Sequence, residues 1–152
     1  MPHIIEKLHQ DHERVEQLFT KLQATSTGAK KTRENLCRTL AQELKAHTQF
    51  EERIFYPAVR ESGDGAGPKV KHALEEHREV ERMLMRLEKM DVASEEFMDL
   101  IGQLQEAVQE HVREEEDEIF PLARKGIEEE DSTQMAIRHD KMIRDVRHHV
   151  TR

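Results

Sequence analysis

Histidine and glutamate residues recur in this chain in two copies that lie about 64 residues apart. Each copy has an acid–histidine pair and, 34 or 35 residues after that histidine, a His-x3-Glu-Glu segment. The matching segments are Asp11-His12 and Glu76-His77, followed by His47-x3-Glu51-Glu52 and His111-x3-Glu115-Glu116. Imidazole nitrogens and carboxylate oxygens together suit first-row metal ions, so a doubled set indicates a two-metal site. The candidate ligands are His12, His47, Glu51, His77, His111 and Glu115.

The spacing within each segment suits such a site. A histidine and a glutamate four residues apart lie one turn apart on the same helix face, so both side chains can reach one metal pair. Four histidines and two bridging glutamates would give each metal two nitrogens and two oxygens. That leaves room for an oxo or hydroxo bridge and an open position for a small ligand. Metals in such pairs lie ~3.5–4 Å apart. Ferritin-like sites differ, because they use Glu-x-x-His and mostly carboxylate ligands.

Apolar residues recur with helical spacing along nearly the whole chain, and they predict the elements that hold these ligands. The expected helices span residues 4–25, 30–61, 68–90, 95–124 and 131–150, with the stripe of the second including Leu40, Leu44, Ile54 and Ala58. A segment rich in glycine, residues 63–68, separates the first helix pair (4–61) from the second (68–124). We therefore expect one domain over residues 1–152. Its predicted fold is all-α: an antiparallel up-down four-helix bundle built from a duplicated helix pair, with an additional C-terminal helix.

Each candidate ligand takes a place on the apolar stripe of its predicted helix. His12, for example, lies between Leu8 and Val15. The two histidines of each copy also lie at matching distances from the ends of their helices, so antiparallel packing brings all six groups to one level. Buried ionisable groups are costly unless they are paired or bound to metal. A two-metal centre in the bundle interior accounts for all six.

These segments resemble the hemerythrin-like family, whose His-x3-Glu members are called HHE cation-binding proteins. The resemblance covers about residues 4–124 and implies a four-helix bundle with a non-haem di-iron centre that meets oxygen, peroxide or nitric oxide. It implies that the histidines of the first copy, His12 and His47, bind one iron. The histidines of the second copy, His77 and His111, would bind the other, and Glu51 and Glu115 would bridge the two. The animal oxygen carriers have a further histidine where this chain has Ala73, which disfavours reversible oxygen carriage here. They also have an aspartate where this chain has Glu116, the residue next to the favoured bridging ligand Glu115.

The predicted function is that of a di-iron protein that binds or senses oxygen or related small species, with two bridged iron ions as cofactor. One alternative is an enzyme in which the same centre decomposes peroxide or reduces nitric oxide. Another is a structural or interaction module that docks a partner through the C-terminal helix. That helix has a stripe of Met135, Met142 and Val146, which could cover the bundle or face outward.

Several further residues could act beside the ligands. Tyr56 is expected to pack in the core with its hydroxyl at the rim, and only a helix distortion before Pro57 would bring it to the metals. His139 is interpreted as a packing histidine that could otherwise lie over the mouth of the bundle. His9 and His72 are interpreted as surface histidines, although each has a glutamate four residues later.

Composition limits the possible partners. The 152 residues carry a formal charge of −8, which argues against nucleic acid and against anionic membrane surfaces. No apolar run approaches the ~20 residues of a membrane span, and the first residues lack the pattern of a signal peptide. The lone Cys37 is expected to be a buried filler and fits a reducing cytoplasm. We expect a small-molecule ligand, with no protein partner indicated.

Overall fold

The computed structural model describes residues 3–62 and 65–150, with side chains described as far as residue 147. This part of the chain is helical apart from short connections, as predicted. The helices are α1 (Ile4–Gln23), α2 (Lys30–Phe50), α3 (Tyr56–Ser62), α4 (Ala66–Glu88), α5 (Glu95–Glu114), α6 (Phe120–Gly126) and α7 (Glu129–Val150). Two π-helical turns, η1 (Glu51–Phe55) and η2 (Glu115–Ile119), join α2 to α3 and α5 to α6. None of these helices is long and apolar enough to cross a membrane.

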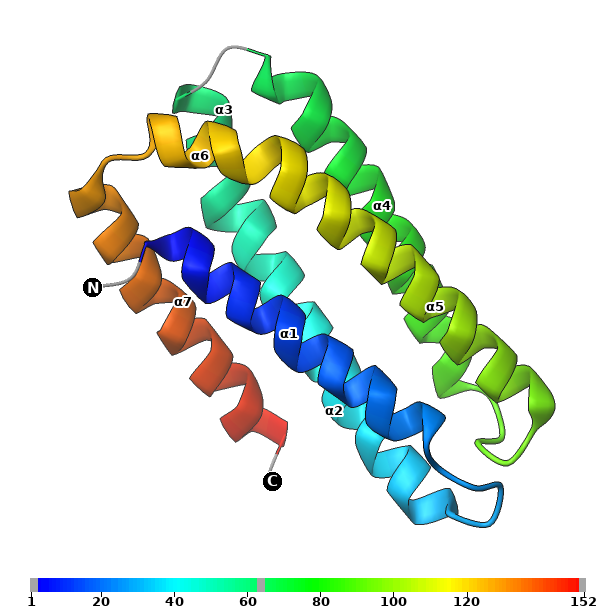
Figure 1. Ribbon diagram of the computed structural model, residues 1–152. Coiled ribbons are helices and arrows are strands. Elements are labelled where there is room, and N and C mark those ends of the chain that lie inside the picture. Colours follow the sequence, from blue (N-terminus) through cyan, green and yellow to red (C-terminus); the bar gives the residue numbers. More distant parts are fainter. Residues whose placement is uncertain (1–2, 63–64, 151–152) are drawn as a thin grey trace.

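Four long helices form the bundle, with α1 antiparallel to α2 and α4 antiparallel to α5 (Figure 1). α1 also packs against α5, and the short helices α3 and α6 meet at one end of the bundle. α5 begins at residue 95, as predicted, and the Ser94 hydroxyl caps it by accepting the backbone N–H of Phe97 at 3.1 Å. α4 begins at Ala66 and α7 at Glu129, each two residues before the predicted start.

Each π-helical turn precedes a proline. Pro57 and Pro121 lack an N–H, and a proline ring clashes with the carbonyl four residues before it in a regular α-helix. The backbone adapts by reaching one residue further. The N–H of Tyr56 donates to the carbonyl of Glu51, and the N–H of Phe120 donates to the carbonyl of Glu115. Both halves therefore contain one extra residue in the turn that begins at a predicted bridging glutamate.

This extra residue changes which side chains enter the core. The predicted stripe continues through Ile54 and Ala58, but both are only half-buried. Phe55, Tyr56 and Val59 are buried in their place, at 0%, 1% and 0% exposure. The regular helical period fails here because an i→i+5 turn rotates all later side chains.

The core is divided in two by a polar layer. The first apolar cluster surrounds the short helices α3 and α6 and includes Leu8, Phe55 and Ala73. The second apolar cluster fills the opposite end of the bundle. It includes Val15, Phe19, Leu44, Leu104 and Val108. The candidate ligands lie between the two clusters, at the common level that the sequence predicts.

α7 lies along α1 and α2, on the outside of the bundle (Figure 1). The Ser132 hydroxyl accepts the N–H of Ile4 at 2.8 Å, which satisfies a backbone donor at the start of α1. Near the other end, Arg147 donates to Glu43 of α2 at 2.8 Å. The predicted stripe is displaced, because the buried row contains Ala136, His139 and Ile143, while the methionines pack at its edge. α7 covers the bundle rather than facing outward.

Candidate metal centre

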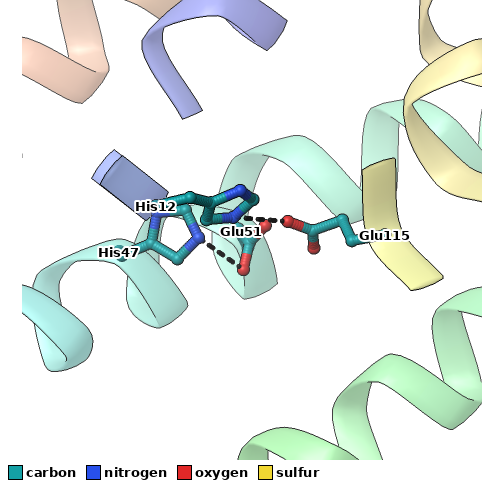
Figure 2. A group of neighbouring side chains, drawn as sticks. All are labelled: His12, His47, Glu51 and Glu115. Atoms are coloured by element: carbon teal, nitrogen blue, oxygen red, sulfur yellow. Dashed lines mark ion pairs between the residues drawn. The ribbon is translucent and has the colours of Figure 1, made fainter. Parts of the chain in front are cut away.

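The structure brings the six predicted ligands together in the polar layer. They form two groups of four, each with its donor atoms within 4.8 Å of one another, and both groups share Glu51 and Glu115. The first group adds the histidines of the first copy, His12 and His47, as Figure 2 shows. The second group adds His77 and His111. Glu51 and Glu115 are 0% and 1% exposed, and all four histidines are buried as well.

Each glutamate contacts one histidine from each half of the chain. Glu51 Oε1 lies 3.2 Å from His47 Nε2 and 3.1 Å from His77 Nε2. Glu115 Oε1 lies 3.1 Å from His12 Nε2, and its Oε2 lies 3.5 Å from His111 Nε2. Both carboxylates therefore span the two groups, which is the placement that a bridging ligand requires.

The other ring nitrogen of every histidine contacts a second carboxylate. The Nδ1 distances are 2.8 Å for His12 to Glu116, 2.8 Å for His47 to Asp11, 2.8 Å for His77 to Glu52 and 2.9 Å for His111 to Glu76. The four carboxylates are direct sequence neighbours of candidate ligands, two of them preceding a histidine and two following a glutamate. A carboxylate that accepts from Nδ1 orients the ring and leaves Nε2 as the free donor atom, as in many metal sites.

The donor atoms facing the centre fit a metal pair. His12 Nε2, His47 Nε2, both oxygens of Glu51 and Glu115 Oε1 are buried and have no hydrogen-bond partner of acceptable geometry, even where an ion-pair distance is short. His77 and His111 point their Nε2 atoms at each other across 3.2 Å. Such lone pairs repel unless a cation or proton lies between them. Ligand atoms ~2.1 Å from one metal lie roughly 3 Å apart in octahedral geometry, close to the spacings here.

Charges in the layer determine where protons reside when no metal is bound. Burial alone would lower the pKa of His111, but hydrogen bonds to Glu115 and Glu76 and nearby negative charge outweigh it and raise the pKa to about 10. The pKa of His47 is also raised well above its usual value, because Glu51 and Asp11 outweigh burial. Burial raises the pKa of Glu115, but hydrogen bonds from His111 and His12 outweigh it, so the pKa is well below normal. The histidines therefore hold protons that a metal must displace.

Tyr56 reaches the centre, contrary to the expected position of its hydroxyl at the rim. Its side chain is buried, and its hydroxyl donates to Glu115 Oε2. The hydroxyl oxygen of Tyr56 also lies 3.3 Å from His77 Nε2. The turn η1 places it there. The equivalent residue of the second half, Phe120, stacks on His12 with ring centroids 5.8 Å apart. Burial and the negative charges of Glu115 and Glu51 raise the pKa of Tyr56 well above normal, so the phenol stays protonated.

His139 of α7 also reaches the polar layer. It packs edge-on against Phe50 at 5.0 Å between ring centroids, as a packing histidine would. In addition, its Nε2 lies 2.6 Å from Asp11 Oδ2, the oxygen that also contacts His47 Nδ1. Burial raises the pKa of Asp11, but hydrogen bonds from His139 and His47 outweigh it, and the net shift is downward.

His9 and His72 lie outside the centre, as expected. Their side chains are 52% and 58% exposed. His9 contacts Glu116 at 3.1 Å, and His72 contacts Glu114 at 3.1 Å. The four carboxylates that support the histidines were not predicted from the sequence. Their signal was present, because an acid directly beside a candidate ligand recurs in both copies.

A duplicated helix pair that supplies four histidines and two shared glutamates defines a four-helix-bundle protein with a site able to hold metal ions. A sequence model of the hemerythrin HHE cation-binding domain matches residues 3–123. The chain therefore belongs to the hemerythrin HHE cation-binding domain family, and α7 lies beyond the matched range.

Three known proteins are similar to this chain over most of its length. A hemerythrin HHE cation-binding domain-containing protein of Mycobacterium kansasii has a crystal structure that matches with a TM-score of 0.81 at 23% identity, over 95% of this chain and 90% of that one. A protein of a Nostoc species named DNA nickase is 33% identical over 129 residues, which is 85% of this chain but 36% of that protein. An uncharacterised hemerythrin-like protein of Schizosaccharomyces pombe is 27% identical over 140 residues, 90% of this chain and 66% of that protein. The chain thus spans about a third of the first of these two relatives and just under two thirds of the second.

Proposed function

We propose that this chain binds two iron ions and uses them to bind or sense oxygen or a related small species. His12 and His47 would hold one ion, His77 and His111 the other, and Glu51 and Glu115 would bridge them. The observation that supports this most strongly is the set of buried, unpaired donor atoms that face a common centre. A bound iron pair would supply redox chemistry and an open position for a small ligand.

The surrounding protein would orient that pair and close it from solvent at both ends of the bundle. Four carboxylates hold the histidine rings through Nδ1, and apolar clusters close the layer from both ends. Iron is preferred here because of the family to which the chain belongs. The same nitrogen and oxygen donors also suit zinc, copper and nickel, so metal analysis is the first experiment.

That experiment is purification from iron-replete cells followed by metal analysis and absorption spectroscopy. The expected result is two iron ions per chain and the spectrum of an oxo-bridged ferric pair. Less than one metal ion per chain, with no uptake by the metal-free protein on reconstitution, would contradict the proposal. Two ions of another metal would keep the two-metal site and reject iron.

An enzyme that turns over peroxide or nitric oxide is the second candidate, and Tyr56 is the observation that favours it. A protonated phenol beside Glu115 could donate a proton to a small ligand bound at the centre. The test compares peroxide loss by the di-iron protein, its Tyr56→Phe variant and free iron at equal concentration. A rate no greater than that of free iron rejects the enzyme. Loss of activity in the variant at full iron content assigns a role to the hydroxyl.

Contact with nucleic acid is not part of this proposal. The Nostoc protein named as a nickase extends well beyond the region that this chain matches. The formal charge of −8 repels phosphates unless a basic surface compensates. We also propose a cytoplasmic location, which the lone Cys37 supports because a reducing compartment keeps single thiols free.

A further inference from the structure

The two halves of the bundle differ at one pair of equivalent positions beside the metal centre. Residues of α1 correspond to residues of α4 that are 65 positions later, so Leu8 corresponds to Ala73 just as His12 corresponds to His77. Leu8 is 0% exposed and fills the first apolar cluster. Ala73 has a far smaller side chain, and the space beside it is part of a cleft of about 230 Å³.

This cleft leads from the surface to the candidate ligands. His111 and Glu115 form its inner part, and Ala73 and Ile119 line the wall. His72 lies at its outer part, with a side chain 58% exposed. The remaining lining residues include three acids and one lysine: Pro68, Lys69, Glu76, Glu114 and Glu118. Solvent and the centre are therefore connected on the α4–α5 face.

On the equivalent face of the first half, a cleft between α1 and α7 reaches Asp11 and His139, but none of the six candidate ligands lines it. Residues of α2 and η1 correspond to residues 64 positions later, so Phe50 and Ile54 replace Glu114 and Glu118. Phe50 is 0% exposed and packs against His139 of α7. Ile54 packs on the first apolar cluster, as does Met135 of α7. α7 runs along α1 and α2, and no helix among the described residues takes the equivalent place over α4 and α5 (Figure 1).

We propose that small ligands reach the metal centre through the cleft beside Ala73, while Leu8 and α7 close the matching route on the other face. This inference rests on the proposed function, because it concerns access to the same centre. At ~30 Å³ per water molecule in the liquid, a cleft of about 230 Å³ has room for roughly eight. Acidic side chains outnumber the one lysine, Lys69, at this mouth, so it disfavours anions, and the favoured ligands are small neutral molecules such as dioxygen or hydrogen peroxide.

The Ala73→Leu substitution places in the second half the same residue, leucine, that closes the matching route in the first half. The probe is nitric oxide, mixed with the di-ferrous protein and followed by stopped-flow absorbance. A narrower passage hinders entering and leaving equally. We therefore expect both the association and the dissociation rate constants to fall about tenfold, equivalent to roughly 1.4 kcal/mol on each barrier, with Kd unchanged. Ala73→Val should show a smaller fall in both constants. The matched control is Leu8→Ala, which should keep the wild-type rates because α7 covers that position.

Unchanged rate constants in Ala73→Leu at two iron ions per chain would overturn the access route and leave the proposed function standing. A changed Kd with an unchanged association rate would also overturn it, because the side chain would then act on the bound ligand. If the wild-type protein takes up no metal, both proposals fail. If Ala73→Leu does not fold, the rate constants of Ala73→Val decide whether the access route stands.

The acidic mouth has its own test with azide as an anionic probe. Glu118→Gln should raise the association rate of azide about twofold at low ionic strength and leave that of nitric oxide unchanged. Glu96→Gln removes the same charge roughly 30 Å away along α5 and should change neither rate. Equal azide rates in wild type and Glu118→Gln would show that the route does not pass this mouth.

Discussion

His139 and Asp11 are 128 residues apart in the chain, yet His139 Nε2 lies 2.6 Å from Asp11 Oδ2 in the buried layer beside the metal centre. Asp11 in turn contacts His47, a candidate ligand. α7 is therefore connected to one half of the centre through a single carboxylate. The equivalent carboxylate of the other half, Glu76, contacts His72, which is exposed. The two halves consequently differ in what supports their histidines.

Replacing His139 should affect both stability and the centre. His139→Ala leaves Asp11 with one buried partner fewer, and we expect the free energy of unfolding to fall by about 2–3 kcal/mol. The spectrum of the iron pair should shift as His47 loses part of its support, whereas His139→Gln should restore part of both by donating to Asp11. Lys7→Ala removes only the exposed contact with Asp140 and should cost less than about 1 kcal/mol. Wild-type stability and spectrum in His139→Ala would contradict this role.

Bridging and terminal ligands should differ in their effect on metal content. Glu51→Ala removes a carboxylate shared by both groups, so the coupled pair should be lost. His47→Ala removes a nitrogen from one group only, and the protein should keep one metal or a weakened pair. His72→Ala is the exposed control and should keep full metal content. Full iron in Glu51→Ala together with loss in His72→Ala would show that the ligand set is wrong.

Metal uptake should depend steeply on pH. Because the pKa of His111 is raised to about 10 in the protein without metal, and those of the other three histidines are raised too, uptake must release protons near neutrality. Affinity should therefore rise with pH. Calorimetry in two buffers of different ionisation enthalpy measures the protons released. Uptake at pH 7 without proton release would contradict the raised pKa values.

The raised histidine pKa values also determine in which direction the stability of the metal-free protein changes with pH. A histidine whose pKa is about 10 when folded and 6.5 when unfolded stabilises the fold fully below pH 6.5. This contribution is lost as the pH rises towards 10. Urea unfolding of the metal-free protein at several pH values should show stability falling across that window, and a rise there would contradict it.

Two glycines should respond in opposite ways to the same substitution. A Cβ at Gly126 would collide with the side chain and carbonyl of Ser62 at the end of α3, so Gly126→Ala should destabilise by about 1–3 kcal/mol. Gly102 lies inside α5 with nothing within 4 Å of an added Cβ. Gly102→Ala should therefore stabilise by roughly 0.5–1 kcal/mol through helix propensity. Denaturant unfolding of both variants checks the contrast, and equal effects would contradict the close approach at Gly126.

The helices and the six candidate ligands are predictable from sequence for one reason. A polar residue on an apolar stripe, such as His12 between Leu8 and Val15, is costly in isolation, so its repetition in both copies carries strong information. The bundle and the common level of the ligands follow from helix length and short connections. The position of Tyr56 does not follow from the regular period, because one residue added in η1 changes the phase of everything after it.

The side of α7 that is buried was equally hard to predict. A row of Met135 and Met142 is more apolar than a row containing Ala136 and His139, yet the second row is buried. The surface on which α7 docks decides this, because Asp11 and Phe50 offer His139 a polar partner and an aromatic contact at once. Such tertiary preferences are absent from the periodicity of a single helix.

The π-helical turns have a consequence for how this centre can diverge. Shortening the chain by one residue between Glu51 and Tyr56 would remove the π-helical turn and rotate every later side chain of α3 by about 100°, with Pro57 then interrupting the regular hydrogen-bond pattern. The phenol would then leave the centre while all six candidate ligands stayed in place. A single-codon deletion in one half is therefore enough to separate ligand binding from whatever the phenol contributes, so evolution can change the two properties independently.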